Sequence, residues 1–562
     1  MSFSSPEFFL FVLGSLLLYY MVPQKVKPFI LLSCNIVFYY LGGGKRMLCF
    51  LVVYILLVYG CGIVVSRIQK KAIIILCILL AVVPLLTTKY LFPLSGGSMM
   101  IPLGISFFSL QAVSYIVDIY KGKIVPEKNM ILFVVYMSLF FYVLSGPIEK
   151  AGSVLPQLKV KREKCLECAA SGLLFFCWGM FQKIVLAERL AQVVDYVYGD
   201  YTYFGGVELF LVTILYSFQL FFDFAGYSNM ALGLARMFSI DIVQNFEQPY
   251  LSMSIAEFWR RWHISLSDWL KEYVYISCGG NRKGKVRKYI NLVITFCVSG
   301  IWHGMGLNYM VWGILHAVYQ IVGSITDKAR KKLRCRFHIR EDVFSYKFFK
   351  VMVTFHLVNF AWIFFRVPSL GDALKIIKRI VAGFHVGDTF GIGRGADYPW
   401  NISIGVNLTN AFPKVLGIPG ISHRDANILI LGFAVAIGVE IFHYKKGSFY
   451  PWLQKQNILF RNMVFFLLVF AILLFGLYGD SYNSSSTGNY HTAEPRRFHS
   501  FPSYTAPDPE RRQGIPWLPS YSRPPEYSGS REHTSPPFRL SPPMNFLPGN
   551  SRPHKRPALF RP

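Results

Sequence analysis

The sequence predicts an all-α protein that crosses a membrane many times. Hydrophobic residues make up 53% of the 562-residue chain and charged residues only 16%, against about 25% charged residues in ordinary soluble domains. Apolar runs recur along the chain, and a helix needs about 20 apolar residues to cross the hydrocarbon core of a bilayer. We therefore expect one polytopic domain over residues 1–479, with roughly 11–13 transmembrane or re-entrant helices.

The expected spans follow one another along this domain. Several are shorter than a full membrane crossing, so we expect some of them to be tilted or re-entrant. The stretches are 8–22, 28–42, 47–66, 72–88, 101–118, 130–145, 168–188, 207–222, 290–303, 308–323, 350–365, 427–443 and 462–478.

Basic residues between the spans predict the orientation of the chain. Lysines and arginines cluster at 25–27, 67–71 and 121–123, after the first, third and fifth spans. By the positive-inside rule these loops are cytoplasmic, which places the N-terminus outside. The basic segments 282–288 and 328–340 are then also cytoplasmic, where we expect contact with anionic lipid headgroups. Docking of an acidic carrier protein or a nucleotide-bearing acyl donor is the alternative.

Charge and cysteine usage exclude two classes of function. The net charge is +28, but it is spread over short loops, whereas nucleic-acid binding needs a contiguous basic face. Cys165 and Cys168 form one ligand-like pair among the ten cysteines, and a zinc site needs a second pair. We therefore predict no nucleic-acid partner, no metal and no bound cofactor.

Composition changes sharply near Gly479. Residues 480–562 contain 16 of the 31 prolines and no apolar run of helical length. Such a segment cannot bury enough surface to offset its ordering entropy, so we expect a disordered tail. We interpret this tail as frameshifted or fused sequence, with a proline-rich ligand segment as the alternative.

Two histidines in tryptophan-rich surroundings are the candidate catalytic residues. His263 ends the segment Trp259–His263, and His303 ends an uncharged run that begins after Lys288. Imidazole is suited to general acid/base chemistry because its unperturbed pKa lies near neutrality. A titratable group at the end of an apolar segment is costly and therefore indicates function. The structural alternative is a histidine that donates to a neighbouring carbonyl. Small residues at 300 and 304 are expected to leave room for an acyl group beside the His303 ring.

The stretch from Ile255 to Tyr273 is predicted to be one amphipathic helix. At 100° per residue its aromatic residues share one arc, whereas Arg260 and Arg261 fall on the opposite side. A helix of this kind lies in the membrane interface. His263 falls on the border of the two faces, so we expect it where lipid meets water.

These motifs resemble the membrane-bound O-acyltransferase (MBOAT) family, and in particular its alginate O-acetylation subgroup. The central match is Glu257-Phe258-Trp259-Arg260-Arg261-Trp262-His263, and the resemblance extends from near residue 1 to about residue 486. The other matching segments, all in the family's order, are 102–107, 145–148, 223–228, 245–251, 279–282, 302–304, 312–316 and 360–366.

The resemblance implies an activity and a set of site residues. His303 would be the essential acid/base, and His263 would orient the donor or relay the proton. Acetyl-CoA or another acyl thioester would donate an acetyl group from the cytoplasmic side of a bacterial cell membrane. An exported cell-envelope polysaccharide would be the final acceptor, reached through a separate extracytoplasmic SGNH-hydrolase-like acetyltransferase. The residues assigned to substrate or donor binding are Trp259, Arg260, Arg261, Trp262, Asn281, Trp302 and His316.

Three further residues each have two interpretations. On one continuous helix His316 would point about 220° away from His303 and could not share its face, so it is a pocket residue or a structural one. His356 is expected to be structural, although intramembrane histidines are usually functional. Asp223 is a functional carboxylate or a helix-end cap.

Two rival functions remain open. A D-alanyl exporter to teichoic acid would take its acyl group from a carrier-protein thioester. A membrane transporter without enzymatic activity would show internal repeats or paired broken helices at corresponding positions, and the sequence shows neither.

Overall fold

The computed structural model describes residues 3, 5–91, 101–160, 166–383, 421–447 and 449–478. The expected disordered tail, residues 480–562, and Cys165 of the cysteine pair lie outside the described residues.

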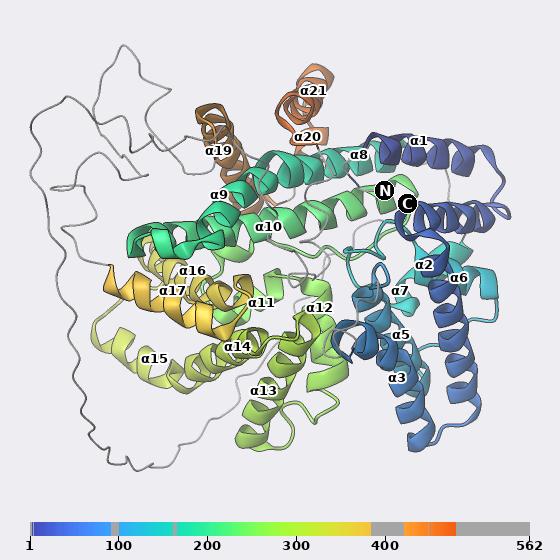
Figure 1. The fold of residues 1–562 in the computed structure, drawn as a ribbon, viewed down its shortest axis with the longest axis horizontal. Helices are drawn as coiled ribbons and strands as arrows, with labels where there is room; N and C mark the ends of the chain where they lie inside the picture. Colours follow the sequence, from blue (N-terminus) through green and yellow to red (C-terminus); the bar gives the residue numbers. More distant parts are fainter. Residues whose placement is uncertain are drawn as a thin grey trace, which may run out of the picture. The chain divides into compact units, whose positions relative to one another are not determined.

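Helices form all of the regular structure in the described residues, which confirms the all-α prediction (Figure 1). The first half contains α1 (Pro6–Met21), α2 (Lys27–Arg67), α3 (Lys71–Leu86), the π-helix η1 (Thr87–Leu91), α5 (Ile105–Tyr120), α6 (Met130–Ser138), α7 (Ala151–Lys159), α8 (Leu166–Met180), the π-helix η2 (Phe181–Ala187), α9 (Glu188–Gly199), η3 (Tyr201–Tyr203) and α10 (Gly206–Met237). The second half contains η4 (Pro249–Leu251), α11 (Ile255–Arg261), α12 (Ile264–Trp269), the π-helix η5 (Leu270–Tyr275), α13 (Gly284–His303), α14 (Leu307–Ile325), α15 (Asp327–Arg336), α16 (Phe344–Arg366), α17 (Leu370–Ala382), α19 (His423–Lys446), α20 (Phe449–Gln454) and α21 (Ile458–Phe475).

Seven helices of the described residues are long and apolar enough to cross a membrane, and the chain is a multi-pass membrane protein. They are Lys27–Arg67, Lys71–Leu91, Glu167–Gly199, Gly206–Met237, Phe344–Arg366, Arg424–Lys446 and Ile458–Phe475. The expected spans 28–42 and 47–66 are the two arms of α2, which breaks at Gly44 (φ 71°). Every other expected span also contains a helix, although α1, α5, α6, α13 and α14 are not among the seven.

The expected span 130–145 is wrong, because α6 ends at Ser138. The next residues form a buried non-helical segment in which Phe140 and Tyr142 are at most 1% exposed. Asn35 of α2 supplies hydrogen bonds where the helix stops. Its side chain accepts from the Phe140 N–H at 3.1 Å and donates to Ser138 Oγ at 3.0 Å. Irregular backbone is tolerated at membrane depth when it is buried in protein, and hydropathy alone does not separate such a segment from a span.

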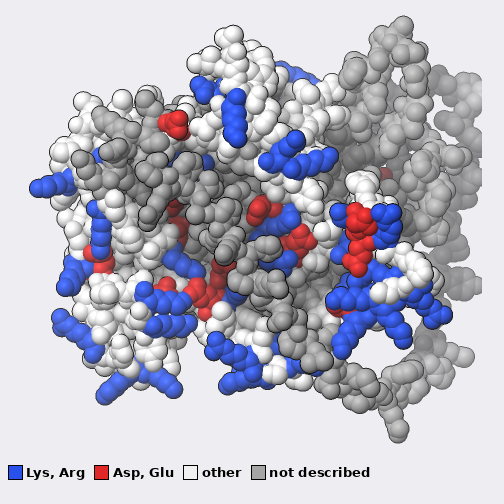
Figure 2. All heavy atoms as spheres, turned by 180° about the vertical axis from the view of Figure 1, so that it is seen from behind, with Lys and Arg blue, Asp and Glu red and all other residues white. Residues whose placement is uncertain are grey.

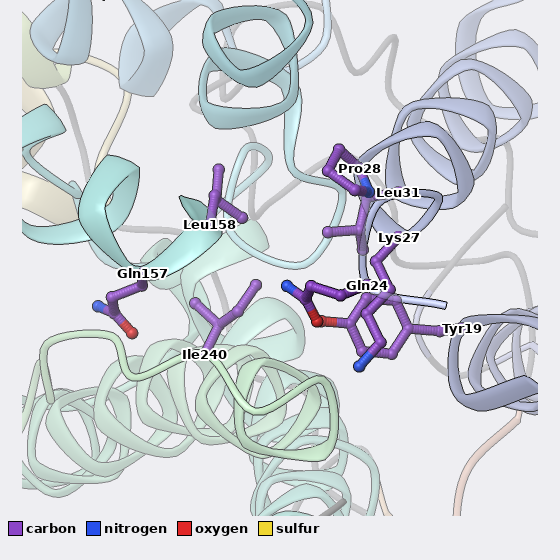
Figure 3. Close-up of a pocket in the computed structure, with 8 residues that line it drawn as sticks. All are labelled: Tyr19, Gln24, Lys27, Pro28, Leu31, Gln157, Leu158 and Ile240. Atoms are coloured by element: carbon purple, nitrogen blue, oxygen red, sulfur yellow. The ribbon is translucent and has the colours of Figure 1, made fainter. Parts of the chain in front are cut away.

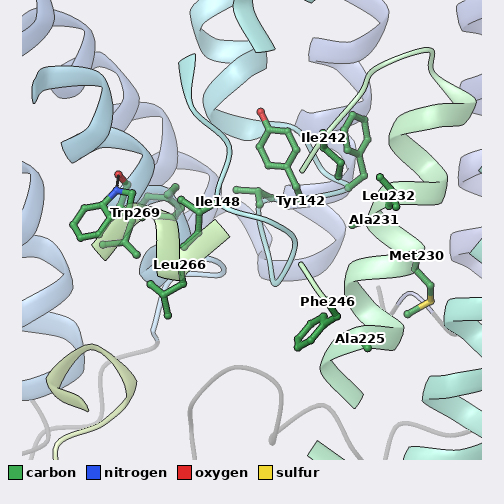
Figure 4. Packing of buried hydrophobic residues seen from close by; sticks show 14 of the residues in the cluster. Tyr142, Ile148, Ala225, Met230, Ala231, Leu232, Ile242, Phe246, Leu266 and Trp269 are labelled. Carbon is green, nitrogen blue, oxygen red and sulfur yellow. Dashed lines mark hydrogen bonds between the residues drawn. The ribbon is translucent and has the colours of Figure 1, made fainter. Parts of the chain in front are cut away.

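Helices α8 and α10 pack with their backbones in contact. A Cβ on Gly179 would lie 2.5 Å from the Gly226 carbonyl oxygen, and a Cβ on Gly233 would lie 2.5 Å from the Gly172 carbonyl oxygen. Small residues permit this close approach between helices in a membrane. Further along α10, Ala225, Met230, Ala231 and Leu232 join the apolar core, next to Phe246 of the segment that follows (Figure 4).

Asp223 lies inside α10 rather than at a helix end, so the cap interpretation is wrong. Its carboxylate accepts a charged hydrogen bond from Lys183 of η2, and Lys183 also pairs with Glu188 at 3.1 Å. The Lys183 side chain is 8% exposed and that of Asp223 is 17% exposed. A buried charge is tolerated when it is paired, so this ion pair joins η2 to α10.

Basic side chains are scattered over the surface in several groups, as the face in Figure 2 shows. The helix α15 contains much of the expected basic segment 328–340, and none of its residues is buried.

Candidate active site

His303 is the last residue of α13, and three aromatic rings surround it. Its ring centroid lies 4.8 Å from that of Trp302, 5.1 Å from that of Trp312 on α14 and 5.2 Å from that of Phe365 on α16. The imidazole is half-buried, and no hydrogen bond joins it to another described residue. Three helices therefore place one accessible imidazole in an aromatic setting.

Glycines let α13 and α14 meet at this point. A Cβ on Gly300 would lie 2.5 Å from the Tyr309 carbonyl oxygen, and a Cβ on Gly304 would lie 2.2 Å from the Tyr309 ring. The prediction that these glycines leave room for an acyl group is therefore wrong, because Tyr309 of α14 fills the space beside them. An acyl group must approach the His303 ring from another side.

The chain breaks at His263, so the predicted continuous helix 255–273 is wrong. The structure has α11, α12 and η5 in its place, and His263 adopts a left-handed backbone (φ 43°, ψ 55°) between α11 and α12. Asn245 stabilises the break: its carbonyl accepts from the Ile264 N–H at 2.9 Å, and its Oδ1 accepts from the Ser265 N–H at 3.1 Å. Strained non-glycine backbone of this kind occurs mainly at functional sites.

The break turns the His263 ring inward. The side chain is 2% exposed, so the expected position where lipid meets water is wrong. Its ring centroid lies 4.6 Å from that of Phe224 and 6.2 Å from that of Trp302. His263 and His303 therefore contact the same tryptophan. Neither ring nitrogen of His263 has a hydrogen-bond partner among the described residues.

His316 joins the same cluster from α14. The angle expected between His316 and His303 on one continuous helix does not apply, because the two residues lie on different helices. The helix α13 ends at His303, and α14 begins at Leu307. The Trp312 ring contacts both histidines, with centroids 5.1 Å from His303 and 5.2 Å from His316. The Trp259 indole N–H donates to His316 Nδ1 at 3.2 Å. Since this indole nitrogen is a donor only, Nδ1 is an acceptor and the proton lies on Nε2.

Tryptophans form the walls of this cluster. Trp312 and Trp362 stack with centroids 5.7 Å apart, and Trp262 lies 5.2 Å from Trp362. The indole N–H of Trp312 and the Nε2 of His316 are buried without a partner among the described residues. Buried polar atoms in native proteins are nearly always satisfied. These donors are therefore placed to receive a carbonyl or hydroxyl oxygen of a substrate.

Three of the predicted binding residues do not reach this cluster in the described residues. Arg260 is exposed, and Arg261 forms an ion pair with Glu257 at 2.7 Å. Asn281 is exposed and accepts a hydrogen bond from Tyr275. The structure does bring Trp259, Trp262, Trp302 and His316 together with the two catalytic candidates.

Sequence reasoning missed three residues of the site. Trp312 and Trp362 lie in the segments 312–316 and 360–366, which matched the family without receiving a role. Lys89 of η1 is the third, and its Nζ donates to the Trp302 carbonyl at 2.5 Å. No sequence signal links Lys89 to a residue more than two hundred positions away.

Glu272 of η5 connects the histidine-bearing segment to the first half of the chain. Its carboxylate accepts hydrogen bonds from Lys123 and from Lys150. Partial burial would raise the pKa of Glu272, but the two ammonium groups outweigh it and hold the pKa below its ordinary value. Next to it, the Tyr273 hydroxyl donates to Asp118 of α5 at 2.7 Å.

A small hollow lies elsewhere in the chain (Figure 3). It is lined by Tyr19, Gln24, Lys27, Pro28, Leu31, Gln157, Leu158 and Ile240, and it shares no residue with the histidine cluster. Within the described ranges no group of three or more His, Cys, Asp or Glu is arranged to hold a metal ion.

The fold and the site define a class: a polytopic membrane protein with three histidines gathered among tryptophans, two of them at helix ends. Residues 62–363 match the membrane-bound O-acyltransferase family. The chain belongs to this family.

Individual relatives agree with this assignment. The peptidoglycan O-acetyltransferase of Helicobacter pylori is 35% identical over 309 residues, which cover 50% of this chain and 57% of that protein. A probable alginate O-acetylase of Pseudomonas fluorescens is 32% identical over 409 residues, or 72% of this chain and 77% of that protein. The teichoic acid D-alanyltransferase of Bacillus subtilis is 27% identical over 282 residues, or 47% of this chain and 68% of that protein.

Proposed function

We propose that this protein transfers an acetyl group from a cytoplasmic thioester toward hydroxyls of an exported cell-envelope polysaccharide. The observation that best supports the proposal is the His303 imidazole, accessible at a helix end and lined by Trp302, Trp312 and Phe365. The relatives named as peptidoglycan and alginate O-acetylases favour acetyl as the acyl group and a glycan as the acceptor.

The proposed chemistry is acyl transfer with His303 as general base and then general acid. A ring nitrogen of His303 removes the proton from the attacking hydroxyl while its oxygen bonds to the thioester carbonyl carbon. The tetrahedral intermediate then breaks its carbon–sulfur bond, and the imidazolium returns the proton to the departing thiolate. The products are an acetyl ester and a free thiol. General acid/base catalysis of this kind contributes about 10²–10⁴-fold to the rate.

The surrounding groups would support this reaction in two ways. The unpartnered indole N–H of Trp312 is a donor for the carbonyl oxygen as its charge develops, and preorganised donors are most effective in a dry site. The aromatic wall excludes water that would hydrolyse the thioester. His263, which contacts the same Trp302 ring as His303, orients the donor or relays the proton.

The proposal also names the acyl donor and the partner protein. Acetyl-CoA or another acyl thioester acts as a substrate rather than a bound cofactor. An extracytoplasmic SGNH-hydrolase-like acetyltransferase receives the acetyl group and completes its transfer to the polysaccharide. The Bacillus subtilis relative raises one rival, in which a carrier protein supplies D-alanine.

A reconstituted assay separates the two donors. The full-length protein in lipid nanodiscs is supplied with the partner acetyltransferase and an acceptor polysaccharide, and with either radiolabelled acetyl-CoA or a radiolabelled D-alanyl carrier protein, and release of free thiol is measured. We expect thiol release from acetyl-CoA that His303→Ala abolishes, with His356→Ala as the matched control on α16. Release from the D-alanyl carrier alone would replace acetyl transfer by the rival. Release at the same rate from the His303→Ala protein would overturn the assigned mechanism.

A further inference from the structure

Two side chains of η1 reach the last turn of α13. Lys89 Nζ donates to the Trp302 carbonyl at 2.5 Å, and the Tyr90 hydroxyl donates to the Ile301 carbonyl. The two acceptors are the residues that precede His303 along the helix. Successive residues of one segment therefore bond to successive carbonyls of another, more than two hundred positions later in the chain.

The chemistry of helix ends explains why this contact stabilises α13. The last four carbonyls of an α-helix have no partner inside the helix, and they form the negative end of its dipole. An ammonium and a phenol at this point supply the missing donors, and the ammonium also supplies the favourable charge. Because α13 ends at His303, the stabilised turn is the one that presents the imidazole.

The local sequence explains how η1 reaches this position. Pro84 lies inside α3 and has no N–H to donate. The hydroxyls of Thr87 and Thr88 both donate to the Pro84 carbonyl, at 3.0 and 2.8 Å. The chain then widens into the π-helix η1, a form that is rare and often occurs at functional sites. This change of helical register directs both Lys89 and Tyr90 to α13.

Trp302 is fixed from further directions. Its indole N–H donates to the Ser106 carbonyl at 3.1 Å, and the Phe107 ring packs against it with centroids 5.7 Å apart. The Lys89 ammonium also lies 5.9 Å from the Trp302 ring centroid, within cation–π range. Both the backbone and the ring of the residue before His303 are therefore held by the first half of the chain.

No acidic side chain among the described residues lies within ion-pair distance of Lys89. Lys89 lies within the candidate span Lys71–Leu91 and pairs with a backbone carbonyl, and charged residues inside membrane spans are rare and usually functional. We propose that Lys89 and Tyr90 are positioning residues, which hold the C-terminal turn of α13 so that the His303 imidazole stays in reach of the reacting groups. This inference rests on the proposed role of His303.

The test uses full-length variants in nanodiscs and measures kcat and KM for thioester turnover. Lys89→Met removes the donor and the charge, Lys89→Arg keeps both, and Tyr90→Phe removes one hydroxyl. Lys71→Met, at the exposed start of α3, the helix that leads into η1, is the matched control. Misplacement of a catalytic group by about 1 Å costs about 10²-fold, so we expect Lys89→Met to lower kcat by about this factor with KM little changed. Lys89→Arg should restore most of the rate, and Tyr90→Phe should lose about fivefold.

Each outcome decides the proposal. Wild-type kcat in Lys89→Met overturns it, and so does a loss that Lys89→Arg leaves unrestored. If Lys89→Met does not accumulate as folded protein, the test is the kcat of Tyr90→Phe. A wild-type kcat in that variant overturns the proposal. His303→Ala is measured in the same assay. If it keeps wild-type activity, the proposed function fails, and that result is distinct from any result at Lys89.

Discussion

The indole N–H of Trp259 donates a hydrogen bond to Nδ1 of His316 over 3.2 Å. This bond joins α11, in which the tryptophan-rich motif begins, to α14, which packs against the helix that ends at His303. It also fixes the tautomer of His316, so the Nε2–H is directed away from Trp259. The two histidine motifs of the sequence are therefore one structural unit.

Replacement of Trp259 by Phe is expected to destabilise this unit. The change leaves His316 Nδ1 as a buried acceptor without a donor, which costs about 1–3 kcal/mol. Thermal unfolding of the purified protein in detergent measures the effect. Trp178→Phe is the matched control, because its indole N–H makes no hydrogen bond to a described residue. Equal unfolding temperatures for the two variants would contradict the importance of the bond.

Replacement of His303 by Ala is expected to abolish O-acetylation in the cell while the protein still inserts and accumulates. The loss is chemical, so residual acetylation should lie near background, about 10²–10⁴-fold below wild type. His263→Ala should also impair the reaction severely, and His356→Ala should have a mild effect. The measurement is the acetyl ester content of the envelope polysaccharide in strains with matched protein levels. Wild-type acetylation in the His303→Ala strain would refute the role of this histidine.

The orientation of the chain is testable at Lys285, in the basic segment 282–288. We expect this segment in the cytoplasm, because basic loops alternate between the spans. A membrane-impermeant thiol reagent should therefore fail to label Lys285→Cys in intact cells and should label it after permeabilisation. The label is detected on a background in which exposed Cys49 and Cys335 are replaced. Labelling of intact cells would reverse the orientation.

The Glu272 cluster predicts a pH dependence of stability. The folded protein holds the pKa of Glu272 below its ordinary value of 4.5, because Lys123 and Lys150 favour the carboxylate. Its contribution to the free energy of unfolding is therefore present above pH 4.5 and is lost as the pH falls through the lowered pKa. Glu272→Gln should be less stable than wild type at pH 7, and the difference should narrow below pH 4.5. A difference in unfolding temperature that is independent of pH would contradict this account.

Local patterns in the sequence predicted most of the helices and singled out two of the histidines that gather in the cluster. Apolar runs located α10 and α16, and the tryptophan–histidine motifs located His263 and His303. The break at His263 was not predictable from helical periodicity, because the bonds that stabilise it come from Asn245, which lies outside the stretch predicted as a helix. Lys89 was also not predictable from a local pattern, because its partner Trp302 lies in the other half of the chain.

The burial of His263 shows what periodicity misses. The pattern at 100° per residue assigns each side chain to one face of a straight helix. Because His263 has a left-handed backbone conformation, its ring does not lie on the face that this pattern assigns. The two arginines expected near the donor end α11 before the break, where Arg260 is exposed and Arg261 pairs with Glu257. A tertiary contact therefore decides which residues of one motif face the site.

The contact between α8 and α10 has a mechanical consequence. At Gly179 and Gly226 the two backbones meet directly, with no side chain between them that can change rotamer. Sliding or rolling of one helix against the other would press the carbonyl oxygens of each helix into the backbone of its neighbour. The two helices therefore resist movement relative to each other. Any opening of the histidine cluster is therefore expected between helices that meet through side chains, such as α14 and α16 at Trp312 and Trp362, while α8 and α10 keep their relative position.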